Sequence, residues 1–393
     1  MPLSRRLDPR SLYGPVTRTT NIAKLAVALA LFLGCGPGVA HAQEAPDVAA
    51  RAWALTDIRS GEVLAGEHVS ERLPMASITK IMVALAALRE ADLEEEATVS
   101  EEAASFATTA YSNVGLLAGD TLSVRELLMA TLVASGDDAA YALAEHLGEG
   151  SARRFVEEMN REAAAFGLED TRFENPVGFD ARGQYSSAGD LARMTRLAMG
   201  YPEFREMVST DYATITTQHR EIELVSTNDL LFTYPPATGV KTGTTPAAGP
   251  SLVASAEDEN ESYLSVILDA REDRFAASIR VLEHGFAAYD RKNLVLRDER
   301  YASAGVPYRR DEKVDLVAKE NVSGLVGGNS EIGREVKILK DLPGAAGPGT
   351  ELGEVVVTVD GVQVGKSPLV ARNGYDEASL WERVWYTASS LWN

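Results

Sequence analysis

A serine and a lysine stand three residues apart in the segment Ser77-Ile78-Thr79-Lys80. A serine hydroxyl is a weak nucleophile and must give its proton to a nearby base during attack. Residues three apart on a helix share a face, so this spacing would place the hydroxyl beside the amine. A lysine can serve as that base where burial or neighbouring positive charge lowers its pKa towards neutrality. Alone the pattern is weak, because a chain of this length carries such a match by chance.

Two further triplets follow in the order that this chemistry uses. Ser-Gly-Asp occupies 135–137 and Lys-Thr-Gly occupies 241–243. The combination of Ser-x-x-Lys, a Ser-x-Asn-like triplet and Lys-Thr-Gly is typical of β-lactamases and penicillin-binding proteins. Ser135 can relay protons, and Lys241 adds a positive field for a substrate carboxylate. Gly243 is small enough to let a substrate approach a strand edge.

With these motifs in place, the chain resembles the D-alanyl-D-alanine carboxypeptidases of the penicillin-binding protein 5 type, serine peptidase family S11. The segment Lys241–Gly249, which leads into Leu252–Ala256, is similar to the family's strand-turn-strand around the third motif. The segment Asn175–Asp180, followed by Gln184–Ala188, is similar to the family's loop between the second and third motifs. The resemblance covers essentially the whole mature chain.

The resemblance implies catalytic roles for Ser77, Lys80 and Ser135. Ser77 would attack the penultimate D-alanine carbonyl of a peptidoglycan stem peptide while Lys80 takes its proton. Terminal D-alanine would depart, and water would then hydrolyse the acyl-enzyme. β-Lactam antibiotics are expected as covalent inhibitors. No cofactor and no metal is implied.

The resemblance also implies a substrate-binding set. An oxyanion hole would be formed by the backbone N–H groups of Ser77 and Thr244, which stabilise charge that develops only in the tetrahedral state. Arg271 resembles an arginine that follows the next strand in many members and helps to bind the carboxylate. The alternative for Arg271 is a surface ion pair with Glu272 or Asp273. The substrate-binding residues expected from the resemblance are Lys241, Thr242, Gly243, Thr244, Asp137 and Arg271.

Asp137 departs from the family pattern, which usually has Asn as the third residue of the second motif. An Asn amide can donate a hydrogen bond to a substrate carbonyl, whereas an ionised carboxylate only accepts. We expect Asp137 to lie within reach of Lys80 and Lys241 and to raise the pKa of Lys80. In the alternative, Asp137 points away and Asp138 or a backbone group clamps the substrate.

Most other functions match these residues less well. A class A β-lactamase shares the three motifs, and Glu174 precedes Asn175, but the Glu-x-x-Leu-Asn spacing is missing. An endopeptidase that cuts D-alanine cross-links would use the same residues. A non-catalytic wall-binding homologue also remains an alternative, because Asp137 departs from the usual Asn of the family. Zinc hydrolase and Ser-His-Asp chemistry lack support, since there is no His-Glu-x-x-His and no Gly-x-Ser-x-Gly.

Hydrophobic periodicity indicates the elements that position these residues. Helices between two groups of strands predict an α+β domain over 46–291, which the resemblance identifies as a penicillin-binding/β-lactamase-like transpeptidase domain. The expected elements are strands at Ala50–Asp57 and Arg59–Ala65, a buried helix at Ile78–Leu88 opened by Pro74 and Ser77, helical segments at Ser123–Leu147 and Ser151–Phe166, and strands at Val240–Ala256 and Tyr263–Ala270.

The composition changes after the catalytic region. Short apolar runs, such as Val314–Val317 and Glu354–Val359, are broken by Gly, Pro and the turn pair Asp360-Gly361, which predicts a smaller all-β domain over 297–371. A last segment, 375–393, is expected to form an amphipathic helix. Its apolar stripe would lie at the headgroup level of a membrane surface or, alternatively, dock on the β domain. The stripe comprises Leu380, Trp381, Val384, Trp385, Ala388, Leu391 and Trp392.

The N-terminus predicts export. Five basic residues precede a short apolar stretch from Leu25 to Leu33, and Ala40-His41-Ala42 is a small-x-small cleavage pattern. Residues 1–42 are therefore expected to be a signal peptide, with the mature chain at the extracytoplasmic face of the cell membrane or in the wall. An uncleaved anchor is the alternative, although the apolar stretch is shorter than the ~20 residues of a spanning helix. Cleavage of the signal peptide would also remove Cys35, the one cysteine of the chain.

The net charge of the chain indicates which kinds of partner it can bind. The formal net charge is −20, and removal of residues 1–42, which carry five basic residues and Asp8, takes it to −24. Nucleic acid is excluded as a partner because so acidic a chain does not neutralise its phosphates.

Overall fold

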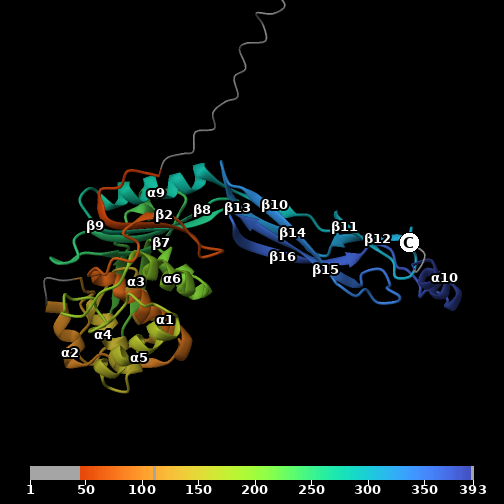
Figure 1. Cartoon of the computed structure of the whole chain (residues 1–393). Helices are drawn as coiled ribbons and strands as arrows, with labels where there is room; N and C mark the ends of the chain where they lie inside the picture. Colours follow the sequence, from red (N-terminus) through yellow and green to blue (C-terminus); the bar gives the residue numbers. More distant parts are fainter. Residues whose placement is uncertain (1–44, 109–111, 391–393) are drawn as a thin grey trace, which may run out of the picture. The chain divides into compact units, whose positions relative to one another are not determined.

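A computed structural model of the chain describes residues 45–108 and 112–390 (Figure 1). The predicted signal peptide lies outside these described residues. Within them, a mixed α and β region is followed by an all-β region and a terminal helix, which confirms the expected fold class.

The first region is built on a five-stranded antiparallel sheet with strand order β2-β1-β9-β8-β7. Both faces are covered, so its strands are apolar on both sides. In β1, Ala52 and Ala54 face the main helical core, while Trp53 and Leu55 belong to the core on the opposite face. The strands are β1 (Ala50–Asp57), β2 (Val63–Glu67), β7 (Ala237–Gly243), β8 (Ser251–Glu257) and β9 (Ser262–Ala270).

Helices cover the two faces of this sheet. Figure 1 shows α9 lying along one face and the helical group that includes α1, α3, α4, α5 and α6 on the other. Two small two-stranded sheets, β3-β4 and β5-β6, belong to the same region. The bounds are η1 (Ala76–Thr79), α1 (Lys80–Glu90), β3 (Glu96–Thr98), α2 (Glu101–Ser105), η2 (Phe106–Thr108), β4 (Thr121–Ser123), α3 (Val124–Leu132), α4 (Asp137–Leu147), α5 (Ala152–Ala165), α6 (Ala188–Ala198), α7 (Pro202–Val208), β5 (Tyr212–Thr216), β6 (Glu221–Val225), α8 (Leu230–Thr233) and α9 (Arg274–Ala288).

The helical segment expected over Ser123–Leu147 is two helices, α3 and α4. Ser123 begins α3 with a capping box, because its hydroxyl accepts from the Glu126 N–H and the Glu126 carboxylate accepts from the Ser123 N–H. The break between the helices contains Ser135, a non-glycine residue at φ 60°. The second motif therefore lies on an interhelical turn.

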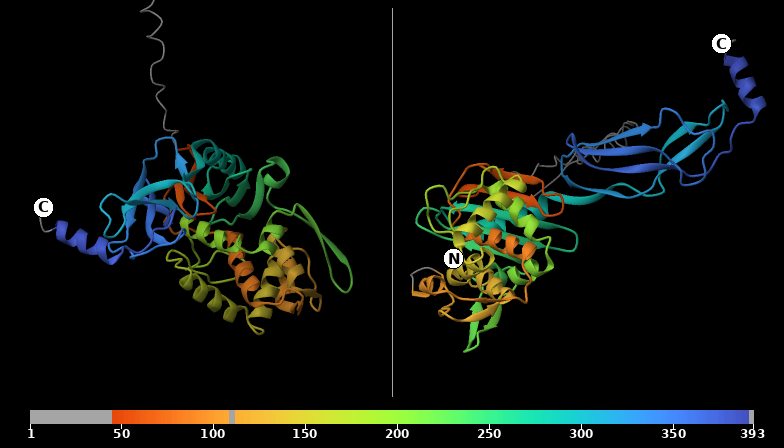
Figure 2. Two further views of the ribbon diagram at one scale, coloured as in Figure 1. Left: turned by 90° about the vertical axis from the view of Figure 1, so that its right-hand side faces the viewer. Right: turned by 90° about the horizontal axis from the view of Figure 1, so that it is seen from below.

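The second region consists of strands β10 to β16, coloured blue in Figure 2. Five of them form a sheet of order β11-β12-β16-β15-β14, and β10 pairs with β13. Asp360 and Gly361 make the tight turn between β15 and β16 with φ 52° and 81°, as the Asp-Gly pair predicts. The strands are β10 (Tyr289–Val295), β11 (Arg300–Gly305), β12 (Lys313–Ala318), β13 (Val322–Gly327), β14 (Ile332–Ile338), β15 (Glu351–Val359) and β16 (Val362–Ala371).

The boundary predicted at 291 falls inside β10, which begins at Tyr289 and hydrogen-bonds to β13. The β region has its own core of small and branched apolar residues, among them Leu316, Val355 and Leu369.

The terminal helix α10 (Leu380–Ser390) exposes its apolar side. Trp381 is 83% exposed and Trp385 76%. Its polar side contacts neighbouring residues: Glu382 pairs with Arg309 at 3.3 Å, and Arg383 pairs with Glu377. No helix among the described residues is long and apolar enough to cross a membrane.

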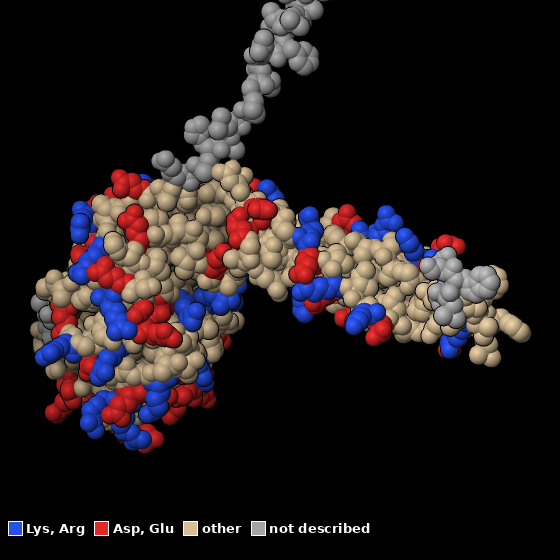
Figure 3. Space-filling model, in the orientation of Figure 1, with Lys and Arg blue, Asp and Glu red and all other residues tan. Residues whose placement is uncertain are grey.

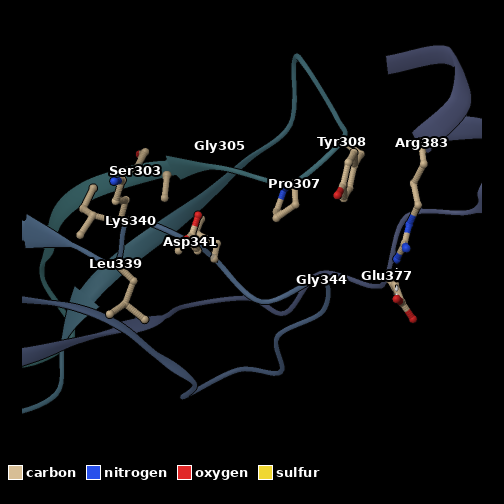
Figure 4. Close-up of a pocket in the computed structure, with 13 residues that line it drawn as sticks. Ser303, Gly305, Pro307, Tyr308, Leu339, Lys340, Asp341, Gly344, Glu377 and Arg383 are labelled. Carbon is tan, nitrogen blue, oxygen red and sulfur yellow. Dashed lines mark hydrogen bonds and ion pairs between the residues drawn. The ribbon is translucent and has the colours of Figure 1, made fainter. Parts of the chain in front are cut away.

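A hollow of about 830 Å³ lies beside the start of α10 (Figure 4). Arg383 lines one end of it, with its guanidinium carbon 5.3 Å from the Tyr308 ring centroid. Lys340 and Asp341 line the same hollow. It contains none of the three sequence motifs.

Acidic and basic side chains are interspersed on the face of the molecule that Figure 3 shows.

Candidate active site

Ser77 lies on the 3-10 turn η1, and Lys80 is the first residue of α1. The helix expected from Ile78 therefore starts with a tighter turn, which changes into an α-helix at Lys80. Ser77 is partly exposed, whereas the turn residues Ala76, Ile78 and Thr79 are buried. Lys80 Nζ donates to Ser77 Oγ at 3.0 Å, so the hydroxyl and the amine are brought together.

Lys80 is fully buried and its amine has three hydrogen-bond acceptors. Besides Ser77 Oγ, Nζ donates to Asp137 Oδ1 at 2.5 Å and to the Val177 carbonyl at 3.1 Å. An ammonium has three donors, so this geometry uses all of them. Burial lowers the pKa of Lys80, and the charge and hydrogen bond of Asp137 oppose that shift.

Asp137 is the first residue of α4 and is 2% exposed. Burial raises the pKa of its carboxyl, and the positive charges of Lys80 and Lys241 act in the opposite direction. The neighbouring Asp138 contacts the backbone of the preceding loop instead of Lys80. Its carboxylate accepts from the backbone N–H groups of Val114 and Leu116, at 3.2 and 3.0 Å, and so holds the preceding loop. Of the two carboxylates, Asp137 is the one in contact with Lys80.

Lys241 is the second buried lysine of the site. It lies in β7, is 1% exposed, and donates to the Thr242 carbonyl at 3.3 Å. Its pKa is well below the ordinary value, first because of burial and then because of the positive charge of Lys80.

Ser135 is 2% exposed at the turn before α4. Two amines and one carboxylate thus share the site.

Gly243 has a packing role at the end of β7. A Cβ at this position would lie 2.8 Å from the Met75 carbonyl and 3.2 Å from the Ala76 Cβ. The missing side chain therefore lets β7 pack closely against the turn that carries Ser77. Thr242 is fixed by a hydrogen bond of 2.7 Å between its Oγ1 and that of Thr227.

The loop at 175–180 contributes a hydrogen-bond acceptor to Lys80, a role that sequence reasoning missed. Val177 supplies the carbonyl that accepts from Lys80. Gly178 has φ 95°, and a Cβ there would lie 2.1 Å from the Ala76 carbonyl, so no other residue fits. Asn175 Oδ1 fixes the turn by accepting from the Gly178 N–H at 2.8 Å. The glycine within Asn-Pro-Val-Gly is the one sequence feature that could have indicated this contact.

The same loop is joined to the turn after the third motif through Asp180. Its Oδ1 accepts from Thr245 Oγ1 at 2.6 Å, and its Oδ2 accepts from the Ala247 N–H at 3.1 Å. One carboxylate therefore links the loop behind Lys80 to the segment that carries Thr244.

Arg274, rather than Arg271, contacts the third motif. Asp273 caps α9, which begins at Arg274, and this directs Arg274 Nη1 to Thr244 Oγ1 at 2.7 Å and to the Gly243 carbonyl at 3.1 Å. Arg271 is exposed at the end of β9, and its N–H donates to the Ala49 carbonyl. The predicted role of Arg271 stays a prediction, and Arg274 is a site residue that the sequence analysis did not single out.

Comparisons with known proteins identify the family to which the chain is similar. A family model described as D-alanyl-D-alanine carboxypeptidase matches residues 39–272, and one described as the penicillin-binding protein 5 C-terminal domain matches residues 289–377. The carboxypeptidase DacF of Bacillus subtilis is 32% identical over 84% of this chain and 87% of its own. DacC of Escherichia coli is 33% identical over 87% and 88%. The crystal structure of penicillin-binding protein 5 from Haemophilus influenzae is similar with a TM-score of 0.68 and 28% identity, covering 85% of this chain and 99% of that one.

Proposed function

The chain belongs to the D-alanyl-D-alanine carboxypeptidase family, peptidase family S11, and from this premise we propose how its own residues remove the terminal D-alanine of a peptidoglycan stem pentapeptide. The observation that carries the proposal is the pair formed by Ser77 Oγ and Lys80 Nζ, 3.0 Å apart, with the amine shielded from solvent. A hydroxyl nucleophile needs such a base within hydrogen-bond reach.

Acylation begins when Lys80 is a neutral amine, the form that burial favours. Ser77 Oγ attacks the carbonyl carbon of the penultimate D-alanine, and its proton passes to Lys80 Nζ as the new C–O bond forms. The carbonyl oxygen becomes an oxyanion, which the N–H groups of Ser77 and Thr244 stabilise. A β-lactam carbonyl is attacked in the same way, so penicillin acts as a covalent inhibitor.

Collapse of the tetrahedral intermediate breaks the C–N bond. The leaving amine takes a proton from Lys80, relayed by the Ser135 hydroxyl, and free D-alanine departs. Water then attacks the ester, gives a proton to the same base, and the C–O bond to Ser77 breaks. Ser77 regains its proton, which restores the starting state.

Positive charge along the third motif recognises the terminal carboxylate of the substrate. Lys241 is buried beside the motif, and Arg274 donates to Thr244 Oγ1 at its end. Lys241 is shielded from solvent, where its attraction for a carboxylate is stronger than on an open surface, whereas Arg274 is part-exposed.

A β-lactamase activity is not favoured, because Glu174 is already engaged. Its Oε1 accepts from Arg172 Nε at 2.9 Å on a part-exposed stretch of the loop. The Glu-x-x-Leu-Asn spacing of a class A β-lactamase is also missing, so we expect the penicilloyl adduct to be long-lived. Cleavage of D-alanine cross-links uses the same groups and is the second activity to be measured.

We further propose that the chain acts at the extracytoplasmic face of the membrane and binds the bilayer surface through α10. The support is the predicted signal peptide together with the exposure of Leu380, Trp381, Val384 and Trp385, which is 60–83%. Tryptophan is favoured at the boundary between headgroups and acyl chains. Because the polar side of α10 already contacts the β region, the apolar side is left for lipid.

Release of D-alanine from a stem pentapeptide tests the activity. The unaltered protein and the control Ser209→Ala, a change on an exposed residue, should release D-alanine at equal rates, whereas Ser77→Ala should release none. Incubation with a cross-linked tetrapeptide dimer measures endopeptidase activity in parallel. The proposal fails if Ser77→Ala retains the pentapeptide activity or if the unaltered protein acts only on the dimer.

A further inference from the structure

Three glutamates from two helices converge at a point remote from the active site. Glu90 is the last residue of α1, and Glu158 and Glu162 lie one turn apart on α5. Residues four apart share a helix face, and this face of α5 contacts α1. One carboxylate oxygen from each glutamate lies within 4.8 Å of the other two.

Glu162 distinguishes this cluster from an ordinary acidic surface. Its side chain is only 5% exposed, and its Oε2 has no hydrogen-bond partner among the described residues. The other oxygen, Oε1, lies 3.2 Å from Arg89 Nε. A buried polar atom without a partner costs free energy, and a buried carboxylate oxygen more than most. A ligand that supplies positive charge at Oε2 would remove that cost.

The local charges leave room for such a ligand. Arg161 pairs with Glu158, and Arg89 pairs with Glu162, so two guanidinium groups face three carboxylates. The side chains of both arginines are substantially exposed, at 65% and 39%. The C-terminal end of α1, where Glu90 stands, is also the negative end of its helix dipole. A net negative charge therefore remains where three oxygens converge.

We propose that Glu90, Glu158 and Glu162 form a binding site for a calcium ion. A ligand set of carboxylate oxygens, without sulfur or imidazole, is suited to hard cations. Ca²⁺ accepts six to eight oxygens in a flexible geometry, whereas Mg²⁺ demands a near-ideal octahedron and usually keeps several waters. Three glutamates that converge from two helices therefore suit Ca²⁺ better than Mg²⁺. Glu90 is exposed, so water can complete the coordination.

The proposed ion would join the end of α1 to α5. Lys80 begins α1 and Glu90 ends it, a distance of about 15 Å along the helix at 1.5 Å per residue. The ion is therefore too far away to take part in the chemistry. Its effect is to hold in place the helix whose first residue is the catalytic base, and to stabilise the folded chain.

Calcium titration of the chelator-treated full chain tests the site. In isothermal titration calorimetry at constant ionic strength, Ca²⁺ should bind saturably with one ion per chain, and the melting temperature should rise with Ca²⁺ concentration. Glu162→Gln and Glu158→Gln should weaken binding at least tenfold and remove most of the rise. Glu157→Gln is the matched control, since Glu157 lies on the same helix with an exposed side chain outside the cluster.

Three other results would contradict the proposed calcium site. Absence of saturable Ca²⁺ binding overturns the proposal, and so does equal binding by the Glu162→Gln and Glu157→Gln variants, which would show only counterion condensation on an acidic chain. Saturable binding of Mg²⁺ alone overturns the choice of ion. If Glu162→Gln does not fold, Glu90→Gln changes an exposed ligand and must give the same tenfold loss.

Discussion

Lys80 Nζ lies 2.5 Å from Asp137 Oδ1, and both side chains are almost completely buried. Burial lowers the pKa of Lys80 and raises that of Asp137, while the charge of each residue opposes the shift of the other. The family's usual Asn at this position would leave Lys80 without that negative neighbour. Asp137 is therefore expected to make Lys80 a weaker base at neutral pH than an Asn would.

Asp137→Asn should shift the rising limb of the pH–rate profile to lower pH. The neutral amine of Lys80 is the active form, so the rate of acylation rises as pH passes the pKa of Lys80. Removal of the negative charge lowers that pKa, and the active form then appears at lower pH. The Asn amide also supplies a donor to the substrate, about 1–3 kcal/mol in a desolvated site, or roughly 5- to 150-fold in acylation.

Rates of acylation by penicillin, measured between pH 5 and 10, check this expectation. Asp138→Asn is a poor control because it would release the Val114 loop, so the unaltered protein is compared directly with Asp137→Asn. Superimposed profiles would show that Asp137 does not set the pKa of Lys80.

Gly178→Ala should damage both stability and activity. The new Cβ would meet the Ala76 carbonyl at 2.1 Å and would sit at φ 95°. Strain at such a backbone position and overpacking each cost about 1–3 kcal/mol. Gly150→Ala is the control, because Gly150 has φ 85° but nothing within 4 Å of the added Cβ. Urea midpoints should fall clearly further for Gly178→Ala, and equal midpoints would refute the role of this close contact.

Arg274→Gln and Arg271→Gln separate two candidates for the carboxylate-binding arginine. Arg274→Gln removes the bonds to Thr244 and to the Gly243 carbonyl, so kcat/KM for the pentapeptide should fall by roughly 10- to 150-fold, as expected for a charged hydrogen bond of about 1.5–3 kcal/mol. Arg271→Gln should have little effect, because its side chain is exposed. A larger loss for Arg271→Gln would assign the role to that residue.

Deletion of residues 377–393 should release the chain from membranes and leave the carboxypeptidase activity in solution intact. The double change Trp381→Ser and Trp385→Ser should have the same effect while keeping the polar contacts of α10. Co-sedimentation with liposomes measures both. Equal partitioning of all three proteins would favour a helix that serves only to dock on the β region.

Much of this architecture could be predicted from the sequence because local rules apply to it. The apolar run of β1 and the Asp360-Gly361 turn follow from the hydrophobic pattern and from turn chemistry. Ser77, Lys80 and Lys241 were selected by motif order, and the fold places the first two in direct contact.

The remaining features depend on contacts between distant segments. The break between α3 and α4 was missed because helical spacing continues across it, whereas the backbone at Ser135 is set by its surroundings. The carbonyl of Val177 carries no sequence pattern at all, since every residue has one. Arg274 was missed because the start of α9, capped by Asp273, decides which arginine faces the third motif.

Mass-spectrometric mapping of a penicillin adduct tests the central claim most directly. After brief incubation with a labelled penicillin, a single long-lived adduct should map to the peptide that contains Ser77. Ser77→Ala should carry no adduct while keeping the melting temperature of the unaltered protein. Labelling that persists in Ser77→Ala, or that maps to another serine in the unaltered protein, would contradict the assignment of Ser77 as the nucleophile.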